Sequence, residues 1–156
     1  MPQIDLRHEI VRNFIRRLTA CLEDDPRRED VLRIVAQAGF SLETTGHGDR
    51  QSGFNQYYRL LERLAPLLQP DGFYLRLGSS YDIMDLGILG YALLSASSLR
   101  ASWDISLTGT PLLMHPSKVI RREDGDRLVL HLEVWSDIPE ARIALVEEWL
   151  AGTWRW

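Results

Sequence analysis

The chain has 156 residues, of which 45% are hydrophobic and 26% charged, and its formal net charge is −4. This composition predicts one folded domain over residues 1–156, and the acidic balance gives no electrostatic footprint for nucleic acid. The single cysteine, Cys21, excludes an internal disulfide. Charges interrupt the apolar residues at the start of the chain, and no apolar run is long enough to span a membrane. We therefore expect a cytoplasmic protein.

Helical periodicity dominates the first forty residues. Apolar residues spaced by three and four predict one amphipathic helix over residues 6–22. Pro26 breaks this pattern, and the apolar residues within 31–38 predict a second, shorter helix that ends at Gly39. Residues 41–53 are polar and contain three glycines, so we expect a loop there.

Two further segments lie between this loop and the middle of the chain. The apolar pattern of residues 54–69 predicts a helix, which we expect Pro66 to bend or end early. Residues 70–82 fit either a short helix or a strand, and we prefer the helix.

The stretch DLGILGYALLSASSLRASWD, residues 85–104, places two glycines inside an apolar helical pattern. Glycine costs about 1 kcal/mol per helix position relative to alanine. We therefore interpret Gly87 and Gly90 as residues that let another element approach the helix closely. Ser97 or Ser98 is expected to cap the next helix. The segment is predicted to form a buried helical elbow, with Tyr91 beside it.

The apolar period changes to two near the C-terminus. In the segment KVIRREDGDRLVLHLEVW, the residues from Leu128 to Val134 alternate between apolar and other positions, which predicts a half-buried strand. The Asp-Gly turn of EDGD pairs it with the preceding KVIRR strand. A final helix is expected to start near Ser136 or Asp137, with Pro139 in its first turn, and to end at Gly152. Its inward residues are predicted to be Ile143, Val146, Trp149 and Leu150.

Together these elements predict an α+β fold, with a mainly helical N-terminal two-thirds, a C-terminal antiparallel β-hairpin and a final helix. A lone hairpin is marginally stable. Its apolar face must therefore lie against these helices or against strands outside this chain.

The same segments resemble a known family. DLGILGYALLSASSLRASWD is similar to the phrase GLLGYALLSSPTLREAL of the N-terminal effector-binding domain of AraC-type transcriptional regulators, in the arabinose-binding-like branch that includes ornithine-utilisation regulators. VLRIVAQAGFSLE, YYRLLERLAPLLQPDGFYLRLGSSYD and SDIPEARIALVEEWLAG resemble its flanking blocks in the same order. The resemblance covers about residues 27–156 and leaves residues 1–26 as an additional N-terminal helix.

Three departures from the family pattern limit what the resemblance implies. Such regulators carry a C-terminal pair of helix-turn-helix motifs, and no such motif follows in this sequence. The family's further strands after the final helix are also missing, and Gly109 and Pro111 interrupt the segment that follows the elbow. We therefore expect that DNA is bound only through a DNA-binding domain absent from this chain. A truncated piece, a shortened gene product and a free-standing half-domain all fit this sequence.

The sequence contains none of the catalytic or metal-binding motifs considered below. The histidines His8, His47, His115 and His131 show no HExxH or HxH spacing, and there is no GxSxG or GxxxxGK[ST] motif. The sequence therefore predicts neither an enzyme nor a metal or cofactor site.

Small-molecule pockets combine apolar and aromatic side chains with a few polar groups. Candidate ligand-binding residues of this kind, which also fit core or solvated positions, are Tyr58, Tyr91, Trp103, Met114, His131 and Trp135. The resemblance implies a ligand-sensing and dimerisation domain that binds a small-molecule effector and acts as a homodimer. The alternative is a ligand-free interaction module that pairs with itself or with a full-length relative.

Overall fold

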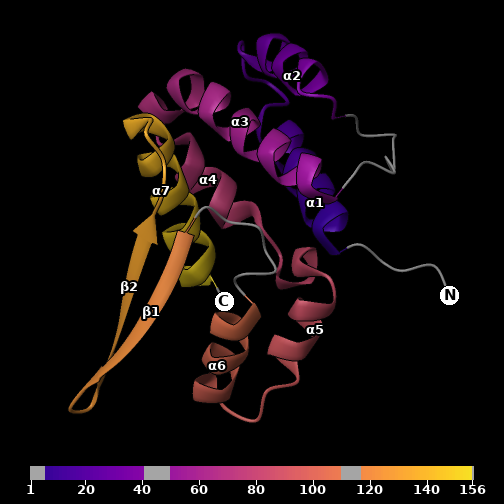
Figure 1. Cartoon of the computed structure of the whole chain (residues 1–156). Helices are drawn as coiled ribbons and strands as arrows, with labels where there is room; N and C mark the ends of the chain where they lie inside the picture. The colour runs from indigo at the N-terminus through magenta and orange to yellow at the C-terminus, as the bar shows by residue number, and fades with distance from the viewer. Residues whose placement is uncertain (1–5, 41–49, 110–116, 156) are drawn as a thin grey trace, which may run out of the picture.

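The computed structural model describes residues 6–40, 50–109 and 117–155 (Figure 1). Helices and one hairpin follow one another along the chain, which confirms the predicted α+β class. The elements are α1 (Leu6–Cys21), α2 (Arg28–Gln37), α3 (Arg50–Leu68), η1 (Gln69–Asp71), α4 (Phe73–Ser80), η2 (Ile83–Leu86), α5 (Ile88–Leu94), α6 (Leu99–Gly109), β1 (Ser117–Asp124), β2 (Arg127–Val134) and α7 (Pro139–Arg155). No helix among these residues is long and apolar enough to cross a membrane.

One hydrophobic core joins α1, α2, α3, α4 and α7. From α1 it takes the predicted stripe, because residues spaced by three and four share one helix face. Phe14 of this stripe meets Tyr57 of α3 edge to face, with 5.2 Å between ring centroids. The fully buried large side chains of the core are Leu18, Leu22, Val31, Leu60, Leu61, Leu64, Leu68, Phe73, Tyr74, Leu77 and Leu145.

A charged turn connects α1 to α2 and to η1. The carboxylate of Asp25 accepts hydrogen bonds from the backbone N–H and the guanidinium of Arg27. The same guanidinium contacts Asp71 at 2.7 Å. Hydrogen bonds from the side chain and then the backbone of Arg27 lower the pKa of Asp25 to about 2. These ion pairs stabilise the turn at Pro26, where the sequence predicts a break in the helical pattern.

The helix α3 departs from its prediction at both ends. It begins at Arg50, inside the segment predicted as a loop. The expectation that Pro66 ends the helix early is wrong, because α3 continues to Leu68. Pro66 lies on the exposed side of the helix, and its missing N–H removes one backbone hydrogen bond without ending α3. The preferred helix in residues 70–82 is confirmed as α4.

The helices α4 and α7 lie side by side and pack very closely (Figure 1). A Cβ atom placed on Gly78 of α4 would lie 2.3 Å from the carbonyl oxygen of Glu148. The inward face of α7 buries Ala141, Ala144, Leu145, Glu148 and Gly152, three of which are small residues. The predicted inward set is therefore wrong for Ile143 and Leu150, which are 45% and 53% exposed. Gly152 lies at the crossing, and the helix continues past it to Arg155.

The predicted elbow is built from η2, α5 and α6, but the expectation that it is buried is wrong, because Ile88, Tyr91 and Leu94 are 65%, 62% and 60% exposed. The capping box of Asp82 and Asp85 starts η2. Gly87 then lies between the two helices with φ of 57° and not inside a helix, which corrects the interpretation of the segment as one helix. Gly90 does permit a close approach, but the approaching group is the carbonyl of Ile83 in the preceding turn. The hydroxyl of Ser98 accepts a bond from the N–H of Ala101 and caps α6.

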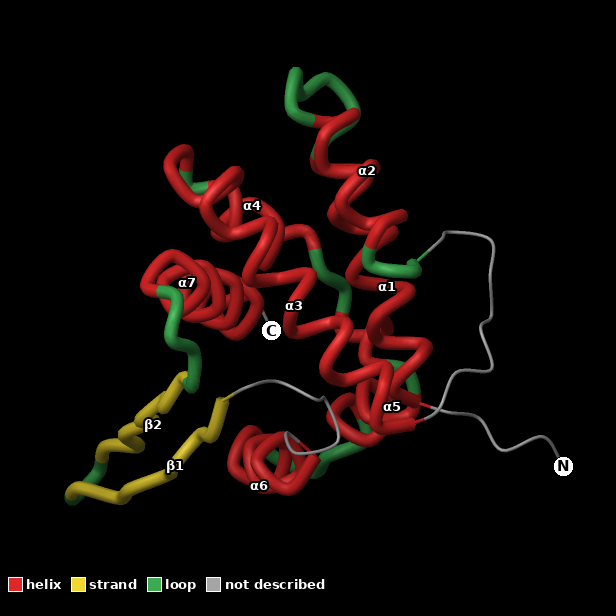
Figure 2. The backbone as a smooth tube through the Cα atoms, turned by 45° about the horizontal axis from the view of Figure 1, so that its top comes forward, coloured by secondary structure: helices red, strands yellow, loops and turns green. Residues whose placement is uncertain are grey.

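The hairpin pairs β1 with β2 in the antiparallel register Ser117↔Val134 to Asp124↔Arg127. The chain reverses at Gly125, whose φ of 62° suits a tight turn. Figures 1 and 2 show the turn end extending away from α3, α4 and α7. Two ion pairs, Arg121 with Asp104 and Arg100 with Glu123, connect the hairpin to α6. Leu128, at the turn end of the apolar hairpin face, stays 42% exposed, so the helices cover this face only in part. Val129 lies on the opposite face and is 44% exposed.

Candidate functional site

A buried carboxyl group lies where α4 and α7 cross. Glu148 comes from the inward face of α7 and is 5% exposed. The hydroxyl of Tyr81, which follows α4, donates a hydrogen bond of 2.5 Å to its Oε1. Its Oε2 is buried and has no hydrogen-bond partner among the described residues. One carboxyl oxygen is thus satisfied and the other is not.

Two further tyrosines surround this carboxyl. Tyr57 of α3 is 3% exposed and Tyr74 of α4 is 1% exposed. Burial raises the pKa of both phenols, and the nearby charge of Glu148 raises both pKa values further. The hydroxyl of Tyr74 is buried without a hydrogen-bond partner in the described part of the chain. We call these four residues, Tyr57, Tyr74, Tyr81 and Glu148, the buried tyrosine–glutamate cluster.

The protonation of Glu148 follows from its surroundings. Burial raises the pKa of this carboxyl to about 7, against a smaller opposing effect of the hydrogen bond from Tyr81. Within the described residues no cation forms an ion pair with it. At neutral pH the cluster can therefore both donate and accept hydrogen bonds. Unpartnered polar groups in an apolar surrounding are costly, and a polar group of a bound molecule would remove that cost.

A second polar cluster surrounds Asp85 of η2 and is fully satisfied. Arg16 contacts one carboxylate oxygen at 2.5 Å and Arg17 the other at 2.7 Å. The backbone N–H of Asp82 donates to the same carboxylate, and the amide of Asn13 donates to the backbone carbonyl of Asp85. Both carboxylate oxygens of Asp85 have partners, so this cluster holds α1 against η2 and its buried acid needs no ligand.

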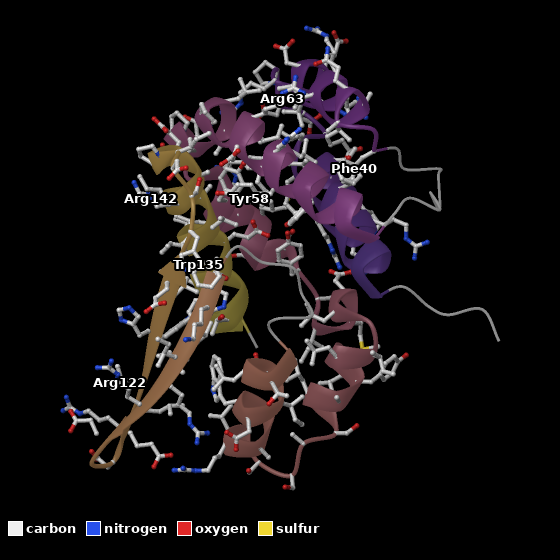
Figure 3. All side chains as sticks on the ribbon, viewed as in Figure 1. Phe40, Tyr58, Arg63, Arg122, Trp135 and Arg142 are labelled. Carbon is white, nitrogen blue, oxygen red and sulfur yellow. The ribbon has the colours of Figure 1, made fainter. Side chains whose placement is uncertain are left out.

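The six ligand candidates from the sequence occupy separate elements. Tyr58 of α3 and Trp135, just after β2, are brought together, because the phenol of Tyr58 donates to the carbonyl of Trp135 at 2.8 Å (Figure 3). Tyr91 on α5 is 62% exposed, Trp103 on α6 is half-buried and His131 on β2 is exposed. Met114 lies outside the described residues.

The sequence interpretation overlooked Glu148. As one of two adjacent glutamates in a terminal helix, it resembled a solvated residue. The available signal was the spacing of Ala141, Ala144, Leu145, Glu148 and Gly152, which places small residues and one acid on a single helix face. The large apolar residues Ile143 and Leu150 on the exposed face suggested a different inward face.

Among the described residues no group of three or more His, Cys, Asp or Glu side chains gathers as a metal-binding set. The buried tyrosine–glutamate cluster contains one carboxyl and three phenols. It is therefore a hydrogen-bonding site.

One of the comparisons with known proteins gives a match. Residues 30–156 match the family described as the arabinose-binding domain of AraC transcription regulators, N-terminal. No curated protein and no solved structure matches the chain. The matched range covers most of the chain and includes all four residues of the buried tyrosine–glutamate cluster. This is a family of regulatory ligand-binding domains and not a class of enzymes. The chain therefore belongs to the arabinose-binding N-terminal domains of AraC transcription regulators.

Proposed function

We propose that this domain senses a small-molecule effector for a transcription regulator, and that the buried tyrosine–glutamate cluster supplies the polar contacts. The observation that carries the proposal is the unpartnered pair of polar groups, Tyr74 Oη and Glu148 Oε2, inside the matched range. Ligand sites place a few polar groups among apolar side chains, as these are. The effector is thus a small molecule with at least one hydrogen-bonding group.

The cluster also connects binding to the rest of the domain. Its four residues come from α3, α4, α7 and the turn after α4, so a ligand held between them favours one packing of these helices. The regulator then acts in the cytoplasm as a homodimer, and reaches DNA through a separate DNA-binding domain. These points rest on the family and belong to the proposal.

A thermal-shift panel of sugars, amino acids, polyamines and aromatic acids tests binding. An effector that binds the folded state raises the melting temperature, and above Kd this rise grows with the logarithm of the effector concentration. Tyr74→Phe is the decisive variant, because it removes a hydroxyl that has no partner. We expect the variant to keep its stability and lose at least about tenfold in effector affinity, which matches the value of one hydrogen bond.

Alanine variants of the candidates from the sequence form the second arm of this experiment. Tyr58, Tyr91, Trp103, Met114, His131 and Trp135 remain proposed ligand residues. Loss of the thermal response in Trp103→Ala or Trp135→Ala, with an unchanged response in Tyr74→Phe, would place the effector near the hairpin. That result would contradict the role proposed for the cluster.

A ligand-free interaction module is the second candidate function. The observation in its favour is the two-stranded sheet, in which each described strand has a single partner and Leu128 and Val129 are exposed. Open strand edges favour strand addition by another chain. Stability that rises with protein concentration, without any response to the panel, would favour this function over effector sensing.

A further inference from the structure

The helix α5 exposes an apolar face that nothing in the described structure covers. Ile88, Tyr91 and Leu94 on α5 are 65%, 62% and 60% exposed, and Leu99 at the start of α6 is 72% exposed. Residues spaced by three follow one side of a helix. We call these four residues, together with Met84 just before the helix, the α5 face.

The opposite side of α5 is fully engaged. Gly90 lies against the carbonyl of Ile83, and Leu93 is buried. Leu89 reaches Gly109 of α6, where a Cβ atom would lie 2.6 Å from a methyl group of the leucine. These contacts hold α5 between η2 and α6 and fix the orientation of the exposed residues. A partner would therefore meet a rigid surface, which lowers the entropic cost of association.

Charge distribution favours a second copy of the chain as this partner. No residue from Leu86 to Leu99 is charged, whereas the whole chain carries −4. The two flanking charges are already paired, Asp85 with Arg16 and Arg17, and Arg100 with Glu123. Two copies can therefore pack α5 against α5 without placing a charged residue of this helix in the interface. An uncharged apolar surface is complementary to itself under twofold symmetry.

The size of the α5 face is also sufficient. Full burial of all five exposed side chains would remove about 600 Å² per copy from water, or about 1,200 Å² for a pair, which is the lower limit of the standard range for stable interfaces. Tyr91 lies in the middle of the run, and tyrosine is a common residue at the centre of interfaces. The hydroxyl of Ser95 donates a hydrogen bond to the backbone carbonyl of Tyr91, so this hydroxyl is satisfied within the chain.

We propose that the α5 face forms a twofold interface between two copies of this chain. The inference rests on the homodimer in the proposed function and assigns that homodimer to a surface. Two α5 helices pack antiparallel across the axis, with the Tyr91 side chains at the centre and Ile88 of one copy near Leu94 of the other.

The experiment measures association by sedimentation velocity over about 1–100 µM. Ile88→Glu brings a charge into the interface, and we expect it to weaken the dimer about 30-fold or more. Leu94→Glu changes the other end of the same face and should have the same effect, so it answers the question if Ile88→Glu does not fold. Circular dichroism verifies the fold of each variant.

Two controls change other exposed apolar residues, Leu150 and Val129, which are 53% and 44% exposed. Leu150→Glu alters α7 and Val129→Glu alters the hairpin, and both variants should remain dimeric. A dimer that survives Ile88→Glu and Leu94→Glu but is lost in either control overturns the assignment and leaves the homodimer intact. A parent chain that is monomeric throughout the range overturns both the assignment and the homodimer. Effector response in the thermal-shift panel is measured separately and is independent of either result.

Discussion

Glu148 shows how strongly position changes the chemistry of a residue. Its neighbour Glu147 is only partly buried, and burial raises the pKa of that carboxyl as well. For Glu148, nearly complete burial raises the pKa to about 7, against 4.5 for the free group. Two adjacent glutamates therefore differ in burial, because helix geometry directs one of them into the core.

The first prediction concerns Glu148→Gln and pH. The folded-state pKa lies above the unfolded one, so the folded protein binds the proton more tightly, and this stabilisation is full below pH 4.5 and lost as the pH rises through about 7. Glutamine keeps the shape and carries no charge. We expect the variant to gain stability over the parent as pH rises from 5 to 8, reaching about 3 kcal/mol. Urea unfolding at each pH measures the difference.

Glu147→Gln is the matched control for this prediction. Glu147 is more exposed than Glu148. The difference in stability between Glu147→Gln and the parent should therefore change much less from pH 5 to pH 8. A difference between Glu148→Gln and the parent that stays constant from pH 5 to pH 8 would contradict the buried, neutral carboxyl.

The second prediction concerns Gly90. A Cβ atom at this position would lie 2.0 Å from the carbonyl oxygen of Ile83, and a backbone oxygen cannot move without moving η2. Overpacking costs about 1–3 kcal/mol or more, against a gain of about 1 kcal/mol in helix propensity. We therefore expect both Gly90→Ala and Gly90→Leu to destabilise the protein in urea unfolding. An alanine variant as stable as the parent would show that η2 and α5 are not in contact.

At the scale of elements, the pairing of α4 with α7 organises the core. Gly78 permits the close crossing, and the crossing in turn places Glu148 beside Tyr81. Gly152 lies at the same crossing, but a Cβ atom there would meet only ordinary contacts of 3.6 Å to the Gly78 carbonyl and 3.9 Å to the Tyr81 ring. The two glycines thus have different roles on one contact surface.

This difference gives the third prediction. Gly78→Ala places a Cβ atom against the α7 backbone and should destabilise the fold by about 2 kcal/mol or more. Gly152→Ala meets open contacts in a helix interior and should be neutral or stabilising by up to about 1 kcal/mol. Paired urea unfolding curves compare the two variants. Equal losses at both positions would mean that glycine flexibility, and not close packing, determines stability here.

Periodicity explains which elements were predictable from the sequence. Helix α1 and strand β2 show unmixed periods of 3.6 and 2, and their positions were predicted correctly. The inward face of α7 was not, because Ile143, Leu150 and Trp154 form an apolar pattern on the solvent side while alanines pack inward. The position of Gly87 between two short helices depends on a positive φ angle, which periodicity does not reveal. The buried tyrosine–glutamate cluster combines residues up to 91 positions apart, from Tyr57 to Glu148, so local sequence patterns could not assemble it.

At the scale of the whole molecule, α1 lies outside the matched range of residues 30–156 and yet belongs to the same core. It contributes Val11, Phe14, Ile15 and Leu18, and the following turn contributes Leu22. Its arginines also neutralise Asp85, which is 7% exposed. The family region of this chain is therefore stabilised by a helix that precedes it.

The last prediction removes this helix. A chain that starts at residue 28 loses five buried apolar side chains, each worth about 1.5–3 kcal/mol, and leaves the Asp85 carboxylate buried without its arginines. The combined loss is comparable to the whole stability of a typical domain, about 5–15 kcal/mol. We expect the shortened chain to show no cooperative thermal transition and a weak near-ultraviolet circular dichroism signal. A peptide of residues 1–26 added in excess should restore both, because it supplies the same packing face and the same two arginines. A shortened chain that melts cooperatively without the peptide would instead show that α2, α3, α4 and α7 form a complete core by themselves.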